Sequence, residues 1–542
     1  MTMLPSTPQR RGRPKKAVNG APSTMKELKD TLWKAADKLR GSMDASQYKD
    51  VILGLIFLKY VSDAFDERRD QIAEELRADG FSEEKLEPLL DDVDEYLGAG
   101  VFWIPAEARW QYLADNAKSP RGTIGSLIDD AMDLIMESNP SLANTLPRLF
   151  NRTNIDQNRL GQLLDLFNNV RFTGHGASKA RDLLGEVYEY FLEKFAAAEG
   201  KRGGEFYTPA SVVRVLVEVL EPTSGRIYDP CCGSGGMFVQ TEKFLEAHGN
   251  KPQAVSVYGQ ELNERTWRMA KMNLAIHGMG ANLGPVWGDS FHRDLHADLR
   301  ADYVLANPPF NIKDWARNEK DSRWRFGVPP AGNANYAWIQ HILSHLAPGG
   351  SAGVVMANGS MSTTSGGEGQ IRAQIVEADL VSCMVALPTQ LFRSTGIPVC
   401  LWFFARDKKP GQRGAVDRTG QVLFIDARNL GYMVDRAERS FTDEDIASIA
   451  NTYHAWRGTA SAQGAGLEYA DRPGFCYSAT IDEVKNAGYA LTPGRYVGAA
   501  EIGGDGEAIG EKIDRLTAEL MEHFTESARL AQTVHDQLER VR

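Results

Sequence analysis

The chain has 542 residues, of which 25% are charged, and its net charge is −11. This length exceeds one ordinary core at about 100–200 residues per domain, so we expect about three folded units. An acidic chain excludes DNA binding by the whole surface, because phosphate contacts come from Lys and Arg. Any DNA contact therefore needs a local basic patch or a partner that supplies the basic surface.

The five cysteines show no C-x-x-C spacing, which predicts reduced thiols in a cytoplasm. The most apolar run, Val51 to Val61, is about half the length needed to cross a bilayer. We therefore expect no membrane span.

Residues 1–24 form a basic tail that we expect to be disordered. Its first sixteen residues contain no acid and include the stretch RGRPKK. The stretch resembles the minor-groove AT-hook, but such a run is also typical of a solubilising tail, so both interpretations stay open. The basic residues are Arg10, Arg11, Arg13, Lys15 and Lys16.

Residues 25–170 are predicted to form an all-helical N-terminal domain. Leu28, Leu32, Ala35 and Leu39 recur at helical spacing, and the apolar run follows in a second helix. The segment Leu183–Ala196 is predicted to be a connecting helix.

Short apolar strands then alternate with helices, which predicts an α/β fold with a parallel, doubly wound sheet. Ligands of such sheets bind at the carboxyl ends of the strands. The predicted strands are Ile227–Asp229, Val255–Glu261, Pro285–Asp289, Tyr303–Asn307, Ala352–Ala357, Val381–Leu387 and Val399–Phe404.

Residues 505–542 are predicted to form a long C-terminal helix. Apolar residues recur there mostly at threes and fours, which gives one apolar stripe. The stripe predicts either a seam for a partner subunit or a helix that folds back on its own domain.

A glycine-rich loop, YDPCCGSGGMF, follows the first predicted strand and opens a helix. Glycines let a ligand approach the backbone closely, and the helix N-terminus offers free N–H groups. Phe238 stands where a dinucleotide fingerprint needs its third glycine, so that fingerprint fits poorly. Cys231 and Cys232 lie in this loop, where we expect them only to fill space.

Acidic residues end the next two predicted strands. Glu261 is well placed to accept hydrogen bonds from both hydroxyls of a ribose, although a charge at a helix N-terminus is the other interpretation. Asp289 is predicted to accept a hydrogen bond from an adenine amino group. Together with the glycine loop, the pair favours a nucleoside ligand.

The fourth strand ends in NPPF, Asn307 to Phe310. Pro308 and Pro309 lack N–H groups and have a fixed φ, so the segment is rigid. With the preceding loops, it resembles the S-adenosylmethionine-dependent methyltransferases that act on adenine N6. In that family the Asn side-chain carbonyl and the first proline's carbonyl accept hydrogen bonds from the target amine. The aromatic ring stacks on the flipped-out base.

The order of GKRGGEFYTP, DPCCGSGG, GQELN, NPPF and LPTQLFRSTGIPVCLWFF resembles the modification (M) subunit of type I restriction–modification systems. The resemblance implies a methyltransferase domain at residues 171–500 with a Rossmann-like fold. It implies the catalytic residues Asn307, Pro308, Pro309 and Phe310. It implies a cofactor site at Glu205, Phe206, Tyr207, Thr208, Pro209, Ala210, Asp229, Ser234, Gly235, Gly236, Glu261 and Asp289.

The same resemblance implies transfer of a methyl group to adenine N6 in double-stranded DNA with a flipped adenine. A specificity (S) subunit would select the site, a second M subunit would join it, and a restriction (R) subunit would cut unmodified DNA. The alternatives are a solitary adenine methyltransferase with its own recognition region, an enzyme acting on RNA or on a protein glutamine, and a scaffold with a dead fold.

His341 and His345 are four residues apart on a predicted helix, which is a spacing found in zinc sites. No Glu follows the first His and no third ligand is evident. We therefore predict ordinary packing there and no metal.

Overall fold

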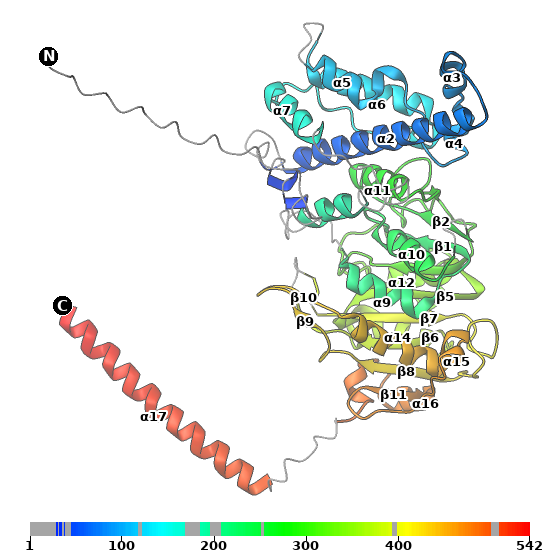
Figure 1. Ribbon diagram of the computed structural model, residues 1–542. Coiled ribbons are helices and arrows are strands. Elements are labelled where there is room, and N and C mark those ends of the chain that lie inside the picture. Colours follow the sequence, from blue (N-terminus) through cyan, green and yellow to red (C-terminus); the bar gives the residue numbers. More distant parts are fainter. Residues whose placement is uncertain are drawn as a thin grey trace, which may run out of the picture.

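The computed structural model describes residues 29–30, 32–34, 37, 45–117, 122–168, 185–195, 208–250, 254–392, 398–499 and 509–541. Within these ranges the chain divides into a helical part, a sheet with helices on both faces, and one long helix (Figure 1). The predicted basic tail, residues 1–24, lies outside the described residues, as do the ends of the predicted connecting helix. No helix among the described residues is long and apolar enough to cross a membrane.

Described residues 45–168 contain helices and no strand. The predicted apolar run forms the buried centre of the first long helix, because Val51 to Leu58 bury every side chain larger than glycine. The helical character of this region agrees with the prediction, while the domain limits of 25 and 170 stay a prediction. The α-helices are α2 (Ala45–Ala78), α3 (Glu83–Leu90), α4 (Val93–Leu97), α5 (Trp110–Asn116), α6 (Ile124–Ser138) and α7 (Gln157–Asn168).

One nine-stranded sheet has the order β11-β8-β6-β7-β5-β4-β1-β2-β3. Its first strands alternate with helices, as the apolar runs predict, and pair in parallel. The strands are β1 (Gly225–Asp229), β2 (Val255–Gly259), β3 (Ala281–Asn282), β4 (Ala301–Ala306), β5 (Leu346–Ala357), β6 (Val381–Ala386), β7 (Val399–Ala405), β8 (Gln421–Asp426) and β11 (Cys476–Thr480).

The sheet is rich in parallel pairs without being wholly parallel. Strand β7 runs antiparallel to both β5 and β6, and β11 runs antiparallel to β8. The Rossmann-like class is confirmed, with β7 as the exception to the predicted direction.

The third predicted strand, Pro285–Asp289, is wrong. The chain pairs with β2 earlier, at Ala281 and Asn282, and Gly284 then turns the backbone at a φ of +75°. Pro285 has no N–H to give to a ladder. Residues 285–289 therefore form a loop, and Asp289 lies in that loop instead of at a strand end.

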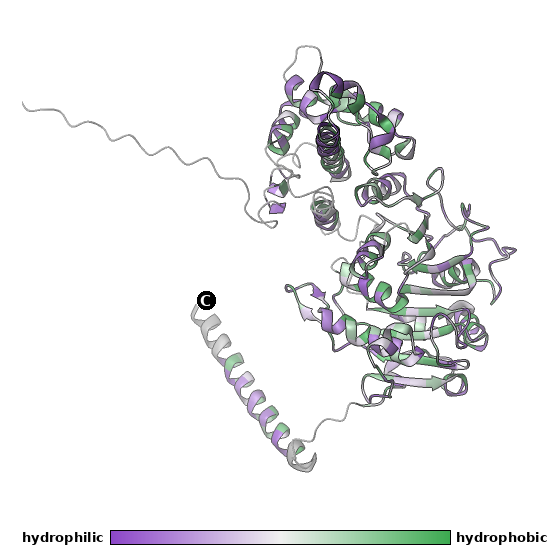
Figure 2. Ribbon diagram, turned by 45° about the vertical axis from the view of Figure 1, so that its right-hand side comes forward, coloured by the Kyte–Doolittle hydropathy of each residue, from purple (hydrophilic) through white to green (hydrophobic). Residues whose placement is uncertain are grey.

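Helices cover both faces of the sheet (Figure 1). The core on one face takes its helical residues from α9 (Ala210–Leu220), α10 (Gly236–Ala247), α11 (Glu264–Ile276) and α14 (Asp443–Arg457). The core on the other face takes them from α12 (Asn335–His345), α13 (Glu368–Glu377) and α16 (Ile481–Asn486). The hydrophobic strands between these layers stand out in Figure 2.

The helical part packs on the sheet part through α11. Met269, Met272 and Ile276 of α11 belong to the hydrophobic core that α2 helps to form. The Tyr60 hydroxyl donates to the Ile276 carbonyl at 3.0 Å across this junction. Since Glu264 begins α11 shortly after Glu261, the helical part borders the side of the sheet where the predicted cofactor residues lie.

The last helix, α17 (Ile509–Val541), has an apolar stripe that faces solvent. Every described side chain of α17 from Ile513 to Gln532 is exposed, so this helix does not fold back on the sheet. Figure 2 shows the alternation of hydrophobic and hydrophilic residues along it. The large exposed apolar residues are Ile513, Leu516, Leu520, Met521, Phe524 and Leu530.

Candidate functional site

Four loops meet at the carboxyl ends of β1, β2 and β4. They follow Asp229, Gly259 and Ala306, and the fourth is the segment at Thr208 that leads into α9. Parallel neighbours end at one edge of a sheet, so these loops share one edge. Glu205, Phe206 and Tyr207 lie outside the described residues, whereas the other predicted site residues are described.

The glycine loop begins at a buried acid. Asp229 is 1% exposed, and its Oδ1 accepts the Cys231 N–H at 2.9 Å. Burial raises the pKa of Asp229 to about 7, and the nearby charge of Glu261 adds to that rise. Burial also raises the pKa of the Cys231 and Cys232 thiols, which fits their predicted role as packing residues.

The rest of this loop leaves open space beside its backbone. A Cβ added at Gly233 or Gly236 would meet no described atom within 4 Å. Gly235 precedes α10 with a φ of +83°, a conformation that favours glycine. The Ser234 carbonyl accepts from Asn273 Nδ2 at 2.9 Å, which ties the loop to α11.

Glu261 joins the first two loops. Its Oε2 accepts the Gly233 N–H at 3.1 Å and its Oε1 accepts the Asn263 N–H at 2.8 Å. The carboxylate is thus fixed beside the glycine loop.

Asp289 stays near Glu261 although it is not in a strand. The Gly288 N–H donates to the Glu261 carbonyl at 2.8 Å, and Asp289 Oδ1 accepts the Phe291 N–H at 2.8 Å. The buried side chain of Gln260 also donates to the Gly288 carbonyl at 3.0 Å. Sequence reasoning missed Gln260, since its position beside Glu261 gave no sign that it holds a distant loop.

The NPPF segment leaves the end of β4 with one polar atom of special interest. Asn307 Nδ2 donates to Thr208 Oγ1 at 2.8 Å. Asn307 Oδ1 is buried, and within the part of the chain that the structure describes no donor reaches it. The pairing brings together two predicted site residues that we had assigned to different roles.

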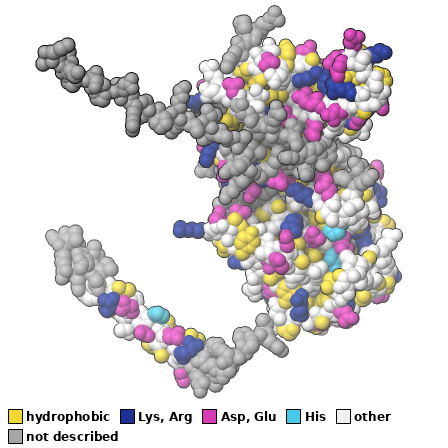
Figure 3. Space-filling view, viewed as in Figure 1, with side chains coloured by type: hydrophobic (Ala, Val, Ile, Leu, Met, Phe, Trp, Pro, Cys, Tyr) yellow, Lys and Arg dark blue, Asp and Glu magenta, His cyan; other side chains and the backbone are white. Residues whose placement is uncertain are grey.

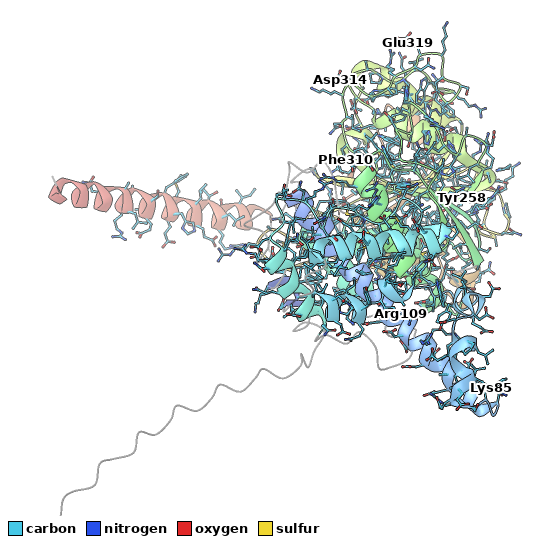
Figure 4. The ribbon with its side chains drawn as sticks, turned by 90° about the horizontal axis from the view of Figure 1, so that it is seen from above. Lys85, Arg109, Tyr258, Phe310, Asp314 and Glu319 are labelled. Carbon is cyan, nitrogen blue, oxygen red and sulfur yellow. The ribbon has the colours of Figure 1, made fainter. Side chains whose placement is uncertain are left out.

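The chain just after NPPF is held by a reciprocal amide pair. The Asn311 N–H donates to Asn335 Oδ1, and Asn335 Nδ2 donates to Asn311 Oδ1, each at 2.9 Å. The Phe310 ring meets the Phe392 ring edge-on, with centroids 6.4 Å apart. Figure 4 shows Phe310 toward one margin of the sheet part, with Tyr258 of β2 well away from it.

The histidine pair on α12 does acquire a third neighbour, which the sequence did not reveal. Asp294, His341 and His345 bring possible ligand atoms within 4.8 Å of one another. However, His341 Nδ1 faces the Arg323 guanidinium at 2.8 Å and its Nε2 faces the Tyr228 hydroxyl at 3.2 Å. These hydrogen bonds and the adjacent positive charge favour packing over metal binding.

Comparison with known proteins agrees with this arrangement. Residues 179–505 match the family described as N-6 DNA Methylase, and residues 28–167 match the HsdM N-terminal domain. The HindI methylase subunit of a type I restriction enzyme from Haemophilus influenzae is 48% identical over 445 residues, covering 79% of this chain and 97% of that protein. The MjaIX methylase subunit from Methanocaldococcus jannaschii is 40% identical over 527 residues, covering 95% and 91%.

The fold has a counterpart in the crystal structure of a type I restriction–modification methyltransferase subunit from Streptococcus thermophilus. The TM-score is 0.73 at 24% identity, and the match covers 88% of this chain and 100% of that one. The chain belongs to the N-6 DNA methylase family and is therefore a methyltransferase. Within that family, it is one of the methylase subunits of type I restriction enzymes.

Proposed function

We propose that this chain transfers a methyl group from S-adenosylmethionine to adenine N6 in DNA, as the modification subunit of a type I restriction–modification complex. The observation that carries the proposal is the buried Asn307 Oδ1, whose amide nitrogen is already engaged by Thr208. An acceptor held in this way suits an incoming N–H group. The family to which the chain belongs supports the same chemistry.

The residues around the glycine loop fit the cofactor. The open space beside Gly233 and Gly236 would take the cofactor against the backbone, and the fixed Glu261 carboxylate would accept from its ribose. Asp289 would meet the adenine amino group, and the segment from Glu205 to Ala210 would line the methionine end. When bound, S-adenosylmethionine supplies an activated methyl group on a sulfonium.

The target amine would be held by two acceptors. Asn307 Oδ1 and the Pro308 carbonyl would each take one N–H hydrogen of the adenine amino group, and Phe310 would stack on the flipped base. The amine's lone pair is delocalised into the ring, so two acceptors favour the tetrahedral geometry that frees it. No strong base is needed before attack, and catalysis rests on positioning and electrostatics.

Partner subunits would supply the rest of the DNA contact. The net charge of −11 argues against a large DNA surface on this chain alone. The exposed apolar stripe of α17 fits a specificity subunit, with a second copy of this chain and a restriction subunit completing the complex. The proposed setting is the cytoplasm, in line with five thiols that all lie in described residues and form no disulfide.

The test is methyl transfer from radiolabelled S-adenosylmethionine by the chain alone and after co-expression with its neighbouring subunits. Duplex DNA, RNA and protein are offered in parallel, and the product base is identified by mass spectrometry. The proposal expects N6-methyladenine in DNA from the assembled complex. Site-specific methylation by the chain alone would favour a solitary enzyme, and label in RNA or protein would contradict the DNA assignment.

A further inference from the structure

A small hairpin projects from the edge of the sheet that carries Asn307. Its strands are β9 (Tyr432–Met433) and β10 (Arg439–Ser440), which pair antiparallel. It follows β8, and β8 runs parallel to β6. Because β5 and β6 both oppose β7, strands β8, β6, β5 and β4 all run in one direction. The hairpin therefore leaves from the carboxyl edge, as NPPF does.

Hydrogen bonds within the hairpin fix the conformation of its tip. Asp435 Oδ1 accepts the N–H groups of Ala437 and Glu438 at 2.7 and 3.0 Å, and the Val434 N–H donates to the Glu438 carbonyl at 2.8 Å. At its base, Arg439 Nη1 donates to the Leu430 and Gly431 carbonyls. These bonds hold the shape of the tip.

Three consecutive apolar side chains on this hairpin face solvent. Tyr432 is 51% exposed, Met433 41% and Val434 55%. Successive side chains of a strand point to opposite faces, so both faces of the hairpin are uncovered. Figure 3 shows a hydrophobic patch with a basic side chain projecting beyond it where Figure 1 draws β9 and β10. An ordered element with two uncovered apolar faces indicates a binding surface.

The hairpin is tied to the neighbourhood of Phe310. The Arg439 N–H donates to the Gln390 carbonyl at 2.8 Å, and Gln390 Nε2 donates back to the Arg436 carbonyl at 3.5 Å. Two residues beyond Gln390, the Phe392 ring meets Phe310. A short chain of contacts thus joins the hairpin to the ring that is proposed to stack on the target base.

We infer that the β9–β10 hairpin inserts into the DNA beside the flipped adenine, with Tyr432 against the bases that the adenine leaves behind. This inference rests on the proposed function. A base that leaves a duplex breaks its stacking on both sides, and an apolar side chain placed in the gap restores part of that contact. The exposed Arg436 at the tip suits a nearby phosphate, while the Asp435 carboxylate is turned onto the tip's own N–H groups.

A protein partner is the other occupant that such a surface could take. A stable subunit interface buries about 800 Å² on each side, and three side chains on a narrow hairpin offer far less than that. The long stripe on α17 is the larger apolar surface for a subunit. The size of the hairpin and its link to Phe310 therefore favour DNA.

The test uses the assembled complex and a duplex that contains its own methylation site, mapped from N6-methyladenine in cellular DNA. In one duplex the target adenine is replaced by 2-aminopurine, whose fluorescence rises when the base leaves the stack. Methylation is measured on a second duplex that keeps the adenine, because 2-aminopurine has no N6 amine. Tyr432→Ala removes the ring and Tyr432→Phe keeps it. Phe81→Ala is the matched control, because Phe81 is 44% exposed on the helical part.

Tyr432→Ala should lower both the fluorescence rise and the methylation rate at subsaturating DNA by about tenfold, in the range of a lost aromatic–base stack. Tyr432→Phe and Phe81→Ala should behave as wild type. Wild-type signals from Tyr432→Ala would overturn the inference, and so would loss of subunit assembly by that variant with its thermal unfolding unchanged. Failure of the wild-type complex to methylate DNA would instead overturn the proposed function.

Discussion

Thr208 Oγ1 lies 2.8 Å from Asn307 Nδ2, although the two residues are 99 positions apart in the chain. The contact turns the Asn307 amide so that its nitrogen faces Thr208 and its oxygen faces the other way. A hydroxyl can accept from an amide nitrogen or donate to an amide oxygen, and here it accepts from the nitrogen and anchors the side chain. Thr208 is thus a positioning residue for the proposed acceptor.

Thr208→Val should lower the methylation rate by about 3- to 10-fold, the value of one ordinary hydrogen bond, because it leaves the amide free to turn. Thr208→Ser keeps the hydroxyl and should restore most of the rate. The check is kcat at saturating cofactor and DNA, together with cofactor affinity. A Val variant with wild-type kcat would remove Thr208 from the account, and equal loss in the Ser variant would point to packing of the methyl group.

Glu261→Gln should weaken binding of S-adenosylmethionine by roughly 10- to 100-fold, since it removes the charge that strengthens the hydrogen bonds of the ribose hydroxyls. The amide has one oxygen in place of two, so it keeps only one of the bonds from the Gly233 and Asn263 N–H groups, and the loop must be checked for folding. Calorimetric titration of the cofactor measures the effect, and circular dichroism controls for folding. Unchanged affinity would exclude Glu261 as a ribose ligand.

Asp229 should make the protein more stable at mildly acidic pH. Its pKa is raised to about 7 by burial, so the folded chain holds this proton more tightly than the unfolded chain, where the pKa is about 4. Stability from this group is therefore lost as pH rises from about 4 through 7, by up to about 1.4 kcal/mol per pH unit.

The measurement is denaturant unfolding of wild type and Asp229→Asn between pH 5 and 8. The amide keeps an acceptor for the Cys231 N–H, so it serves as the matched variant without the titrating group. Wild type should lose stability relative to Asp229→Asn up to pH 7 and level off above it. Parallel curves across the whole range would show that Asp229 has no raised pKa.

Deleting residues 507–542 should abolish assembly with the specificity subunit and leave cofactor binding intact. The reason is the exposed apolar stripe of α17, which lies outside the sheet and its loops. A finer version replaces Leu520 and Phe524 with Asp, with Glu522→Ala as the control between them. Analytical ultracentrifugation of the co-expressed subunits measures whether the complex assembles. Normal assembly of the truncated chain would refute this role.

The apolar runs in the sequence explain which strands of the fold could be predicted. β1, β2 and β4 were predicted within about two residues, because each is an apolar run closed by polar loop residues. β3 was missed because it has only two residues, Ala281 and Asn282, and no apolar run marks it. β8 and β11 were not predicted, although QVLFID is a recognisable apolar run.

The site shows a similar division. The sequence motifs follow strand ends, so they indicated which residues gather at the carboxyl edge of the sheet. The contacts between loops, such as Thr208 with Asn307 and Gln260 with Gly288, join residues far apart in the chain and carry no local pattern. Asp289 lies near Glu261, as predicted positions at adjacent strand ends would, but the Gly288 N–H bond to the Glu261 carbonyl places it there and a strand does not.

Asn307 is proposed to hold the target amine while other residues hold the cofactor. The most direct test is single-turnover methylation by the complex containing Asn307→Ala, at saturating S-adenosylmethionine, so that product release cannot mask the chemical step. Loss of one preorganised partner should slow the reaction about 10²–10³-fold, or roughly 3–4 kcal/mol, with cofactor affinity close to wild type. Methylation by Asn307→Ala at the wild-type single-turnover rate would contradict the account.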